Sequence, residues 1–448
     1  MPVLWQPRSA TFLGEDNILS IGQTVPSGIA TRVAAATGLV NPPALANEGQ
    51  KESYSEDICI IGDGIESLAL ACLLKSHNAN LNPGSVRILS SVVPPHLEVS
   101  SLAPQRQPLQ SAEIVHDHRR EEFSETRNFK RSGYNDVSSS NELAYTIDGA
   151  AGLILSCPAS SYGAVLDRIA PAIADGATVA LVGATAFAAL EFEHELSARR
   201  KDLNVDILEV DALFSRVHRT GSGIEVGGLR RRVNVAAISR NAARRGMWLA
   251  SSLSTNLMPS SSILERALLD VESIVRPLFL LSALMGGRLD ALSEISRLLN
   301  RSNLALLVEL EQEMSRLAFA SGCRLVDFAR ALREEIDAGS TYRAADGPTC
   351  DVTLAEALVS IGGNWFSQVG TGWSYNLALG MLTAYVSEHL VLLAELSQIF
   401  AIDAPVLNSV IAMSSALAGY DLKANGRSMA KLGLPEVKKD DLQEAISA

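Results

Sequence analysis

Two glycines and a serine near residue 60 form the first pattern in this chain that could do chemistry. In the stretch IIGDGIES, Gly62 and Gly64 have the GxG spacing of a phosphate-binding turn, and Ser67 falls where that pattern has its third small residue. The first glycine permits a tight turn, the second lets the backbone approach a pyrophosphate, and the helix that follows directs its N-terminal amides at the anion. The alternative is a tight strand–helix turn that binds nothing.

The elements around this turn favour dinucleotide binding. Residues 57–76 begin as an apolar strand, pass through the glycines and continue with helical spacing, and a second strand is predicted at 85–91. This is the βαβ order that the fingerprint requires. The second strand ends on Ser90 and Ser91, where an acidic residue would hold the ribose hydroxyls of NAD, so the cofactor choice leans to NADP over NAD.

Strands and helices go on alternating farther along the chain. Apolar, β-branched runs at 152–158, 178–184 and 205–211 are separated by helical stretches such as 162–176, which predicts a parallel sheet covered on both faces. A further strand pair is expected at 214–238. Ligands of such sheets lie at the carboxyl ends of the strands. The candidate cofactor-binding residues are therefore Gly62, Gly64, Ile65, Ser67, Ser90, Ser91, Pro158, Ala159 and Gly183.

The pattern divides the chain into three parts. Residues 1–55 show no sustained period and form an N-terminal extension. Residues 56–255 are predicted to be an α/β domain, a Rossmann-like doubly wound parallel sheet. It contains a polar insertion at about 92–142, whose charged middle, 116–131, is expected to be a surface helix or a mobile segment. Residues 256–448, where apolar residues recur at three- and four-residue spacing, are predicted to be an all-α domain for substrate binding and dimerisation.

The composition, net charge and cysteine count argue against several classes of protein. The chain has 448 residues, 47% of them hydrophobic, and a formal charge of −12, which argues against a nucleic-acid partner. Its five cysteines form no CxxC pair, so neither a disulfide framework nor a metal site is expected. The N-terminus lacks the pattern of a secretory signal, and charges interrupt the apolar runs before the roughly 18 residues of a membrane span. We therefore expect a cytoplasmic protein with no membrane partner.

Five segments of the chain are informative when they are taken in order: IIGDGIESLALACLLKS, GLILSCPASSYGAVLDRIAPAI, VALVGATAF followed by LEVDALFSR, SIVRPLFLLSAL, and LAELSQIFAIDAPVLNSVI. In this order they resemble the opine dehydrogenases, most closely their staphylopine and pseudopaline type. The resemblance runs from about Ile58 to the C-terminus. It implies that the chain uses NAD(P)H to reduce the imine formed from an amino acid and a 2-oxo acid, in the biosynthesis of a metallophore or another specialised metabolite. It also implies a homodimer formed through the helical domain.

The resemblance also shows where this chain differs from that family. At the start of the helical domain the family carries a catalytic histidine before a proline, and the matching residue here is Arg276, ahead of Pro277. A guanidinium stays protonated, so Arg276 is expected to hold a substrate carboxylate or a cofactor phosphate, or to polarise the imine or carbonyl, and not to act as a general base. The family's acidic residue after the strand at 205–211 falls on Ser215, or on Asp211 if the alignment shifts by one.

Two functional hypotheses follow from these departures. His389, the one histidine of the helical domain, is either a packing residue or the replacement acid/base, so the candidate catalytic residues are Arg276, His389 and Ser215. The basic residues that hold the NADP phosphate in the metallophore branch are also missing at Ser90 and Ser91. The leading hypothesis is an NAD(P)-dependent oxidoreductase acting on CH–NH bonds. The alternative is a repurposed or catalytically silent member that binds a nucleotide or metabolite, or does non-redox chemistry.

Overall fold

The computed structural model describes most of the chain after residue 149 and separate short segments before it. The described residues are 58–62, 66–67, 69–70, 74, 86–89, 98–101, 125–126, 147 and 149–439, without 215–216, 221–222, 227–229, 231, 239, 254–256, 325, 337–352 and 362–371. The predicted N-terminal extension, residues 1–55, lies outside them.

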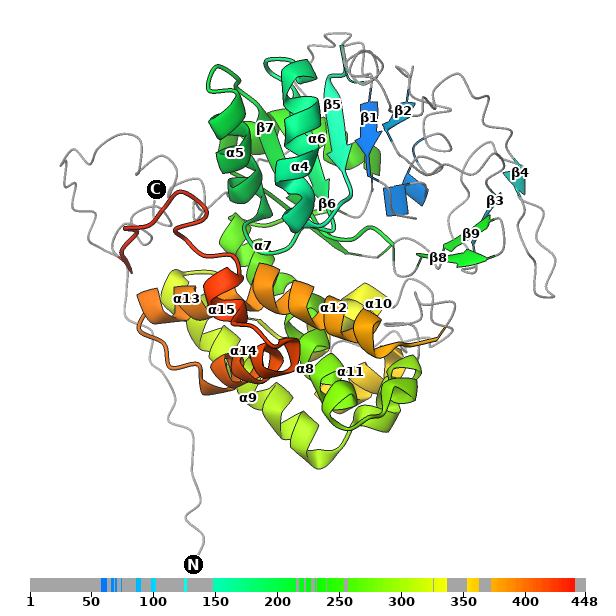
Figure 1. Cartoon of the computed structure of the whole chain (residues 1–448), viewed down its shortest axis with the longest axis vertical. Coiled ribbons are helices and arrows are strands. Elements are labelled where there is room, and N and C mark those ends of the chain that lie inside the picture. The colour runs from blue at the N-terminus through cyan, green and yellow to red at the C-terminus, as the bar shows by residue number, and fades with distance from the viewer. Residues whose placement is uncertain are drawn as a thin grey trace, which may run out of the picture.

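A seven-stranded sheet forms the first half of the described structure (Figure 1). Its strands are β1 (Ile58–Ile61), β2 (Val86–Leu89), β5 (Gly152–Leu155), β6 (Thr178–Val182), β7 (Asp206–Val210), β10 (Val233–Ala237) and β11 (Leu257–Pro259). They lie in the order β11-β10-β7-β6-β5-β1-β2, and from β2 to β7 all neighbours are parallel. The predicted Rossmann-like fold is confirmed.

One edge of the sheet departs from the predicted parallel arrangement. β10 runs antiparallel to β7, and β11 runs parallel to β10. The chain between β7 and β10 forms a hairpin, β8 (Val217–Thr220) and β9 (Gly223–Val226), in place of a crossover helix. A parallel neighbour needs a long crossover connection, whereas an antiparallel neighbour does not, so this connection accounts for the reversed direction.

The hairpin belongs to a second sheet, of four strands. Its other strands are β3 (Glu98–Ser101), which is parallel to β9, and β4 (Glu125–Thr126), which is antiparallel to β3. The strand pair predicted at 214–238 is therefore present. β4 lies inside the charged stretch 116–131, and its pairing excludes the predicted surface helix at that point.

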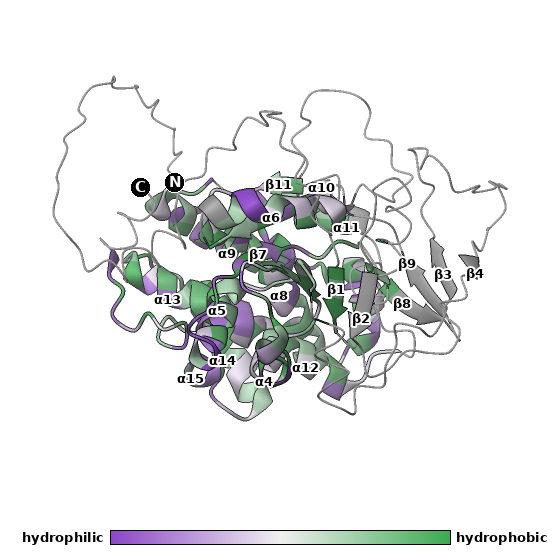
Figure 2. Ribbon diagram, turned by 90° about the horizontal axis from the view of Figure 1, so that it is seen from above, coloured by the Kyte–Doolittle hydropathy of each residue, from purple (hydrophilic) through white to green (hydrophobic). Residues whose placement is uncertain are grey.

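Alternate residues of the large sheet face two hydrophobic layers. Cys59 and Ile61 of β1 share a layer with α4 (Tyr162–Ile169) and α5 (Ala188–Arg199). Ile58 and Ile60 face the other layer, which includes α6 (Arg240–Leu253). Side chains of a strand point to opposite faces in turn, so a strand that is apolar throughout must be covered on both faces. Figure 2 shows β1 strongly hydrophobic among the surrounding helices.

After β11 the described chain is helical, as predicted. The helices are α7 (Ile263–Leu269), α8 (Val271–Met285), α9 (Arg301–Ser321), α10 (Phe328–Ile336), α11 (Leu354–Ile361), α12 (Tyr375–Tyr385), α13 (Val391–Ile399), α14 (Pro405–Ala418) and α15 (Leu422–Asn425). A π-helical turn, Val386–Leu390, joins α12 to α13. Ser262 and Asp270 accept hydrogen bonds from the first-turn amides of α7 and α8, so the side chains of these two residues fix where the two helices begin.

One helical stretch within the described residues, Tyr375–Ile399, is long and apolar enough to cross a membrane. Half of its apolar window is buried inside the protein. The core helix of a globular protein has the same properties, so this stretch is weak evidence for a membrane span. The predicted lack of a membrane partner stays a prediction.

Candidate functional site

The glycine turn lies where the strand order of the sheet reverses. β2 lies on one side of β1, and β5, the next strand of this sheet along the chain, lies on the other. The turn after β1 begins with Gly62 and the turn after β5 with Ser156, whose amide donates to the Ile61 carbonyl at 3.0 Å. Doubly wound sheets bind dinucleotides outside the carboxyl ends of their strands at this reversal. The sequence pattern and the topology therefore mark the same place.

Gly62 has no room for a side chain. Its φ is +156°, and a Cβ there would lie 2.3 Å from Ser67 Oγ and 2.4 Å from the Ser156 carbonyl oxygen. Ser67 is fully buried, and its hydroxyl donates to that carbonyl at 3.4 Å. A small residue at 67 thus lets the helix pack closely on the strand ends, which is the role of the third position in the fingerprint.

Pro158, Ala159 and Gly183 lie at neighbouring carboxyl ends. Pro158 is exposed after β5 and precedes a short 3₁₀ turn that starts with the buried Ala159. Gly183 is exposed after β6, has a φ of +70°, and donates its amide to the Val210 carbonyl at 2.9 Å. These are the places that the sequence predicts for them, and their contact with a cofactor stays a prediction. The predicted residues Gly64, Ile65, Ser90, Ser91 and Ser215 lie outside the described residues.

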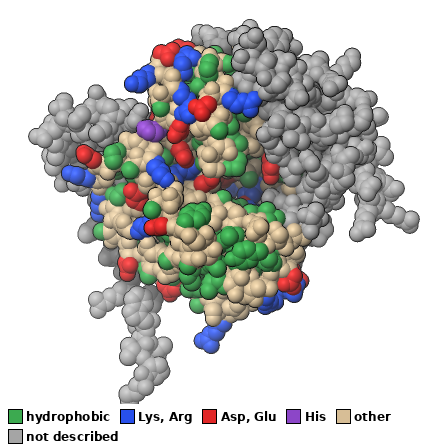
Figure 3. All heavy atoms as spheres, viewed as in Figure 1, with side chains coloured by type: hydrophobic (Ala, Val, Ile, Leu, Met, Phe, Trp, Pro, Cys, Tyr) green, Lys and Arg blue, Asp and Glu red, His purple; other side chains and the backbone are tan. Residues whose placement is uncertain are grey.

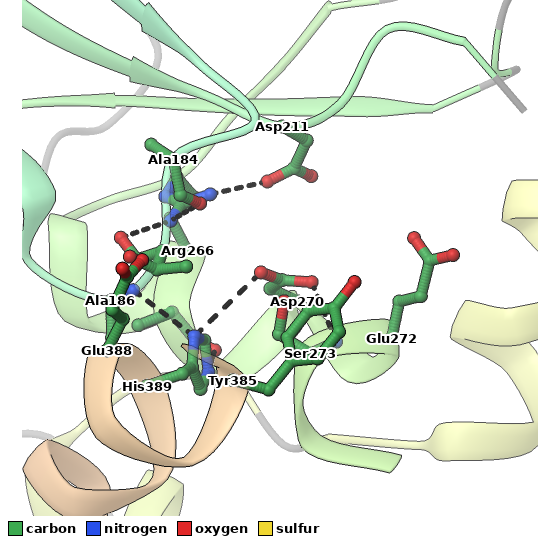
Figure 4. Close-up of polar contacts among 12 residues, drawn as sticks. Ala184, Ala186, Asp211, Arg266, Asp270, Glu272, Ser273, Tyr385, Glu388 and His389 are labelled. Atoms are coloured by element: carbon green, nitrogen blue, oxygen red, sulfur yellow. Dashed lines mark hydrogen bonds and ion pairs between the residues drawn. The ribbon is translucent and has the colours of Figure 1, made fainter. Parts of the chain in front are cut away.

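A buried arginine joins the carboxyl ends of β6 and β7 to the helical half (Figure 4). Arg266 on α7 is fully buried and donates to Glu209 at 2.7 Å and to Asp211 at 2.6 Å. It also donates to the carbonyls of Ala184 and Thr185 at 2.7 and 3.0 Å. A buried ion pair is stable when its remaining polar atoms are also bonded. Arg266 therefore fixes α7 on the sheet, and Asp211, the alternative to Ser215, is engaged in that pair.

Burial disfavours the charged forms of Arg266, Glu209 and Asp211. It raises the pKa of Glu209 and of Asp211 above their ordinary values, although Arg266 acts in the opposite direction. For Arg266, burial acts to lower the pKa, but the two carboxylates outweigh it, and the pKa lies above its ordinary value. The cluster therefore depends on all of its members, because removing one would leave a buried charge without its partner.

His389, in the π-helical turn, has both ring nitrogens bonded to the backbone. Nδ1 accepts from the Ala186 amide at 3.1 Å, and Nε2 lies 3.1 Å from the Ala267 carbonyl, which assigns the proton to Nε2. The side chain is fully buried, and burial lowers its pKa to about 4 although Asp270 lies 3.9 Å away. Neither nitrogen is available to a substrate in this arrangement. The surroundings fit the packing interpretation of His389 and not that of an acid/base.

Arg427 makes a second connection between the two halves. Its guanidinium donates to Thr185 Oγ1 at 2.8 Å, to the Glu388 carbonyl at 2.6 Å and to the Ala186 carbonyl, and it pairs with Glu191 at 2.6 Å. Thr185 and Ala186 follow β6, whereas Glu388 lies in the π-helical turn of the helical half. The segment after α15 therefore clamps this turn to the sheet. Figure 3 shows red and blue side chains along the boundary between the halves.

Arg276 lies in a third charged group at the same boundary. It forms an ion pair with Glu272, one helical turn earlier on α8, and Glu272 also pairs with Arg230 from the segment before β10. Arg230 in turn donates to the Phe214 carbonyl at 3.2 Å, so the group connects α8 to the segment that follows β7. Arg276 is buried. The sequence predicts a substrate or cofactor anion as its partner, and the structure adds an internal carboxylate, that of Glu272.

Arg276 also contacts Tyr385 at the end of α12. The guanidinium donates to the Tyr385 hydroxyl at 2.5 Å and lies 5.8 Å from the centre of its ring. Sequence reasoning missed Tyr385, Arg230 and Glu272. The spacing of four residues between Glu272 and Arg276 on a predicted helix could have revealed the first pair. No local signal pointed to Tyr385, which is 109 residues away from Arg276.

No group of three or more His, Cys, Asp or Glu side chains that could hold a metal ion is present among the described residues. The predicted lack of a metal site stays a prediction.

The fold is similar to that of solved dehydrogenases. Octopine dehydrogenase in complex with NADH and agmatine matches with a TM-score of 0.55 and 14% sequence identity over 87% of this chain and 95% of that chain. Yersinopine dehydrogenase with NADP⁺ bound matches with a TM-score of 0.53 and 14% identity over 87% of this chain and 98% of that chain. No protein-family model and no curated protein matches the sequence. At this identity the similarity establishes the fold alone.

Proposed function

We propose that this chain is an NAD(P)H-dependent oxidoreductase that reduces a carbon–nitrogen or carbon–oxygen double bond in a small substrate bearing a carboxylate. The observation that carries the proposal is the turn at Gly62. It lies at the reversal of strand order, excludes any side chain at its first glycine, and is followed by a helix packed through the small Ser67. These are the features that let a backbone approach a pyrophosphate, so the residues present fit a nicotinamide dinucleotide.

The structural neighbours support the cofactor class and the substrate class. The octopine dehydrogenase structures hold NADH with agmatine, L-arginine or pyruvate, and the yersinopine dehydrogenase structure holds NADP⁺. The finer proposal is that the reduced bond is the imine of an amino acid and a 2-oxo acid, made for a metallophore or another specialised metabolite, with NADP preferred over NAD. Arg276 supplies N–H donors that polarise the double bond or hold the carboxylate.

Cofactor binding is the first test. Titration of the purified chain with NADPH and with NADH, followed by nicotinamide fluorescence, is expected to give saturable binding, with NADPH the tighter. Oxidation of the bound cofactor is then followed at 340 nm with pairs of amino acids and 2-oxo acids. Absence of both a fluorescence change and a thermal shift with either nucleotide would rule out the proposal.

A second candidate function is a chain that binds a nucleotide or metabolite without reducing a substrate. The surroundings of His389 favour it, because both ring nitrogens bond the backbone and His389 therefore does not replace the histidine expected at Arg276. NADPH binding without oxidation in the presence of any substrate pair would support this candidate. Steady oxidation with one pair would exclude it.

The remaining expectations concern assembly and location. We propose a homodimer formed through the helical half, in the cytoplasm, with no nucleic-acid or membrane partner. Helices α12 and α14 are without charged residues, and Figure 3 shows apolar side chains gathered on this half of the molecule. Light scattering coupled to gel filtration measures the mass in solution and decides between monomer and dimer.

A further inference from the structure

A reductase of this kind needs a group that gives a proton to the substrate, and most polar groups near Arg276 cannot do so. The guanidinium of an arginine stays protonated and only donates hydrogen bonds. Glu272 accepts from both Arg230 and Arg276, and an ionised carboxylate only accepts. His389 has both ring nitrogens bonded to the backbone and is fully buried. Among the described residues, these groups leave another side chain to supply the proton.

Tyr385 has the geometry that these groups lack. Its hydroxyl oxygen accepts from Arg276 at 2.5 Å, so its own O–H is left to donate. Among the residues that the structure describes, that O–H meets no acceptor. Tyr385 is partly exposed, whereas Arg276 and Glu272 are buried. Figure 4 shows the ring extending from its helix with the hydroxyl directed away from the π-helical turn.

A chain of contacts places this hydroxyl at the boundary between the two halves. It runs from the Phe214 carbonyl, beyond β7, through Arg230 and Glu272 to Arg276 and Tyr385. The carboxyl edge of the sheet, where a dinucleotide would lie, meets the helical half along the same boundary. A substrate bound there would have the Tyr385 O–H and the charge of Arg276 on one side.

We propose that Tyr385 is the proton donor of the reaction and that the bond reduced is the carbonyl of a 2-oxo acid. This inference rests on the proposed NAD(P)H-dependent oxidoreductase function and takes the carbon–oxygen double bond in place of the imine. The carbonyl carbon gains a hydride, which NAD(P)H supplies as it is oxidised to NAD(P)⁺. The Tyr385 O–H bond breaks as an O–H bond forms on the substrate oxygen, which gives a 2-hydroxy acid. Arg276 stabilises the phenolate through its N–H until water returns the proton.

The same residues favour a carbonyl over an imine. Coupling an amino acid to a 2-oxo acid first requires a base that removes a proton from the ammonium group. Arg276 cannot accept a proton, Glu272 is bound by two guanidiniums, and His389 is closed off by the backbone. A carbonyl needs only the hydride and a donor for the developing alkoxide, and a phenol next to a guanidinium is such a donor.

The test compares Tyr385→Phe with Tyr375→Phe, an exposed tyrosine at the other end of the same helix. Wild type is expected to oxidise NADPH with a 2-oxo acid alone. Tyr385→Phe should lower kcat about 100-fold or more, because general acid catalysis contributes factors of this size. It should also abolish the solvent isotope effect of proton transfer, and Tyr375→Phe should do neither. NADPH affinity should stay unchanged in both variants.

A binding measurement adds a readout that does not depend on turnover. Calorimetric titration of the NADP⁺ complex with oxamate, a carbonyl analogue of a 2-oxo acid, should give a Kd about 5- to 10-fold weaker in Tyr385→Phe, since one hydrogen bond is lost. A kcat within 3-fold of wild type in Tyr385→Phe would overturn the role of Tyr385, and turnover that requires an amine would overturn the carbonyl as the reduced bond. Either result would leave the proposed oxidoreductase function in place. If wild type neither binds nor oxidises NAD(P)H, the proposed function fails and Tyr385 loses its role with it.

Discussion

At the scale of the residue, Arg276 differs from the histidine that the resemblance to the opine dehydrogenases places at this position, and the difference changes what the neighbouring side chains must do. A histidine gives and takes a proton near neutral pH, whereas an arginine only donates hydrogen bonds. The arginine brings its own requirements, because a buried guanidinium needs a carboxylate and further acceptors. Glu272 and Tyr385 meet them. In our proposal the proton-donating role passes from the residue at 276 to the tyrosine that contacts it.

His389 makes the stability of the fold depend on pH. Its pKa is lowered to about 4 by burial, with Arg266 and Arg427 adding to the effect and Asp270 opposing it. The unfolded chain therefore binds a proton on this residue at a higher pH than the folded chain does. The contribution of His389 to the free energy of unfolding is fully present above the ordinary pKa of about 6.5. It is lost as the pH falls towards 4, and the loss is about 3 kcal/mol.

Urea denaturation at pH 7 and at pH 4.5 measures this loss. His389→Gln is less stable at pH 7 but should lose less stability on acidification than wild type, because the buried histidine no longer has to gain a proton. His194→Gln, at a partly exposed position on α5, controls for the removal of a histidine. Equal losses in wild type and His389→Gln would contradict the prediction.

At the scale of the element, the strand, turn and helix around Gly62 act as one unit. The strand is short and apolar, the glycine has a φ that other residues rarely adopt, and the helix is held against the strand end by Ser67. Each part matches a local feature of the sequence. A change at Gly62 should therefore affect both stability and binding.

Gly62→Ala is expected to lower the free energy of unfolding and to abolish NADPH binding. The added methyl group would lie 2.3 Å from Ser67 Oγ and 2.4 Å from the Ser156 carbonyl oxygen. Overpacking of this kind costs about 1–3 kcal/mol beyond the cost of the backbone conformation. Gly176→Ala is the matched control, because Gly176 has a φ of +78° and no atom within 4 Å of the added group. Its cost is about 1–2 kcal/mol, from the left-handed conformation alone. Equal effects of the two variants would argue against a crowded turn.

At the scale of the whole molecule, the two halves share one boundary that is both apolar and charged. The hydrophobic layer under α4 and α5 continues into α7 and α8, and three arginines, Arg266, Arg276 and Arg427, bond across or along the boundary. A continuous layer and buried ion pairs resist separation of the halves. The position of the helical half over the carboxyl ends of the sheet is therefore fixed by packing, and the proposed site lies within that boundary.

Arg427→Met should loosen this boundary without unfolding either half. The change removes bonds to Thr185, to the Ala186 and Glu388 carbonyls and to Glu191, and we expect a loss of about 2–4 kcal/mol. Amide hydrogen exchange should become faster at 184–191 and 386–390 and stay the same in α9. Lys423→Met, at an exposed position on α15, is the control and should change neither. Faster exchange spread evenly over the chain would show global destabilisation.

The sequence by itself determined the elements and the fold class of this protein. The glycine turn, the apolar strands and the three- and four-residue spacing after β11 are local patterns, and the backbone responds to them locally. Because strands and helices alternate along the chain, helices on both faces of the sheet also followed. The direction of β10 and β11 did not follow, because it depends on the hairpin that replaces a crossover helix.

Only the tertiary structure decided the partners of the charged residues. His389 bonds to an amide 203 residues away, Arg266 to a carboxylate 57 residues away, and Arg276 to a phenol 109 residues away. No period or spacing in the sequence encodes such pairs, because they form where packed elements bring distant segments together. The buried position of His389 and the partly exposed position of Tyr385 arise from the same packing of α7, α8 and the π-helical turn on the carboxyl ends of the sheet.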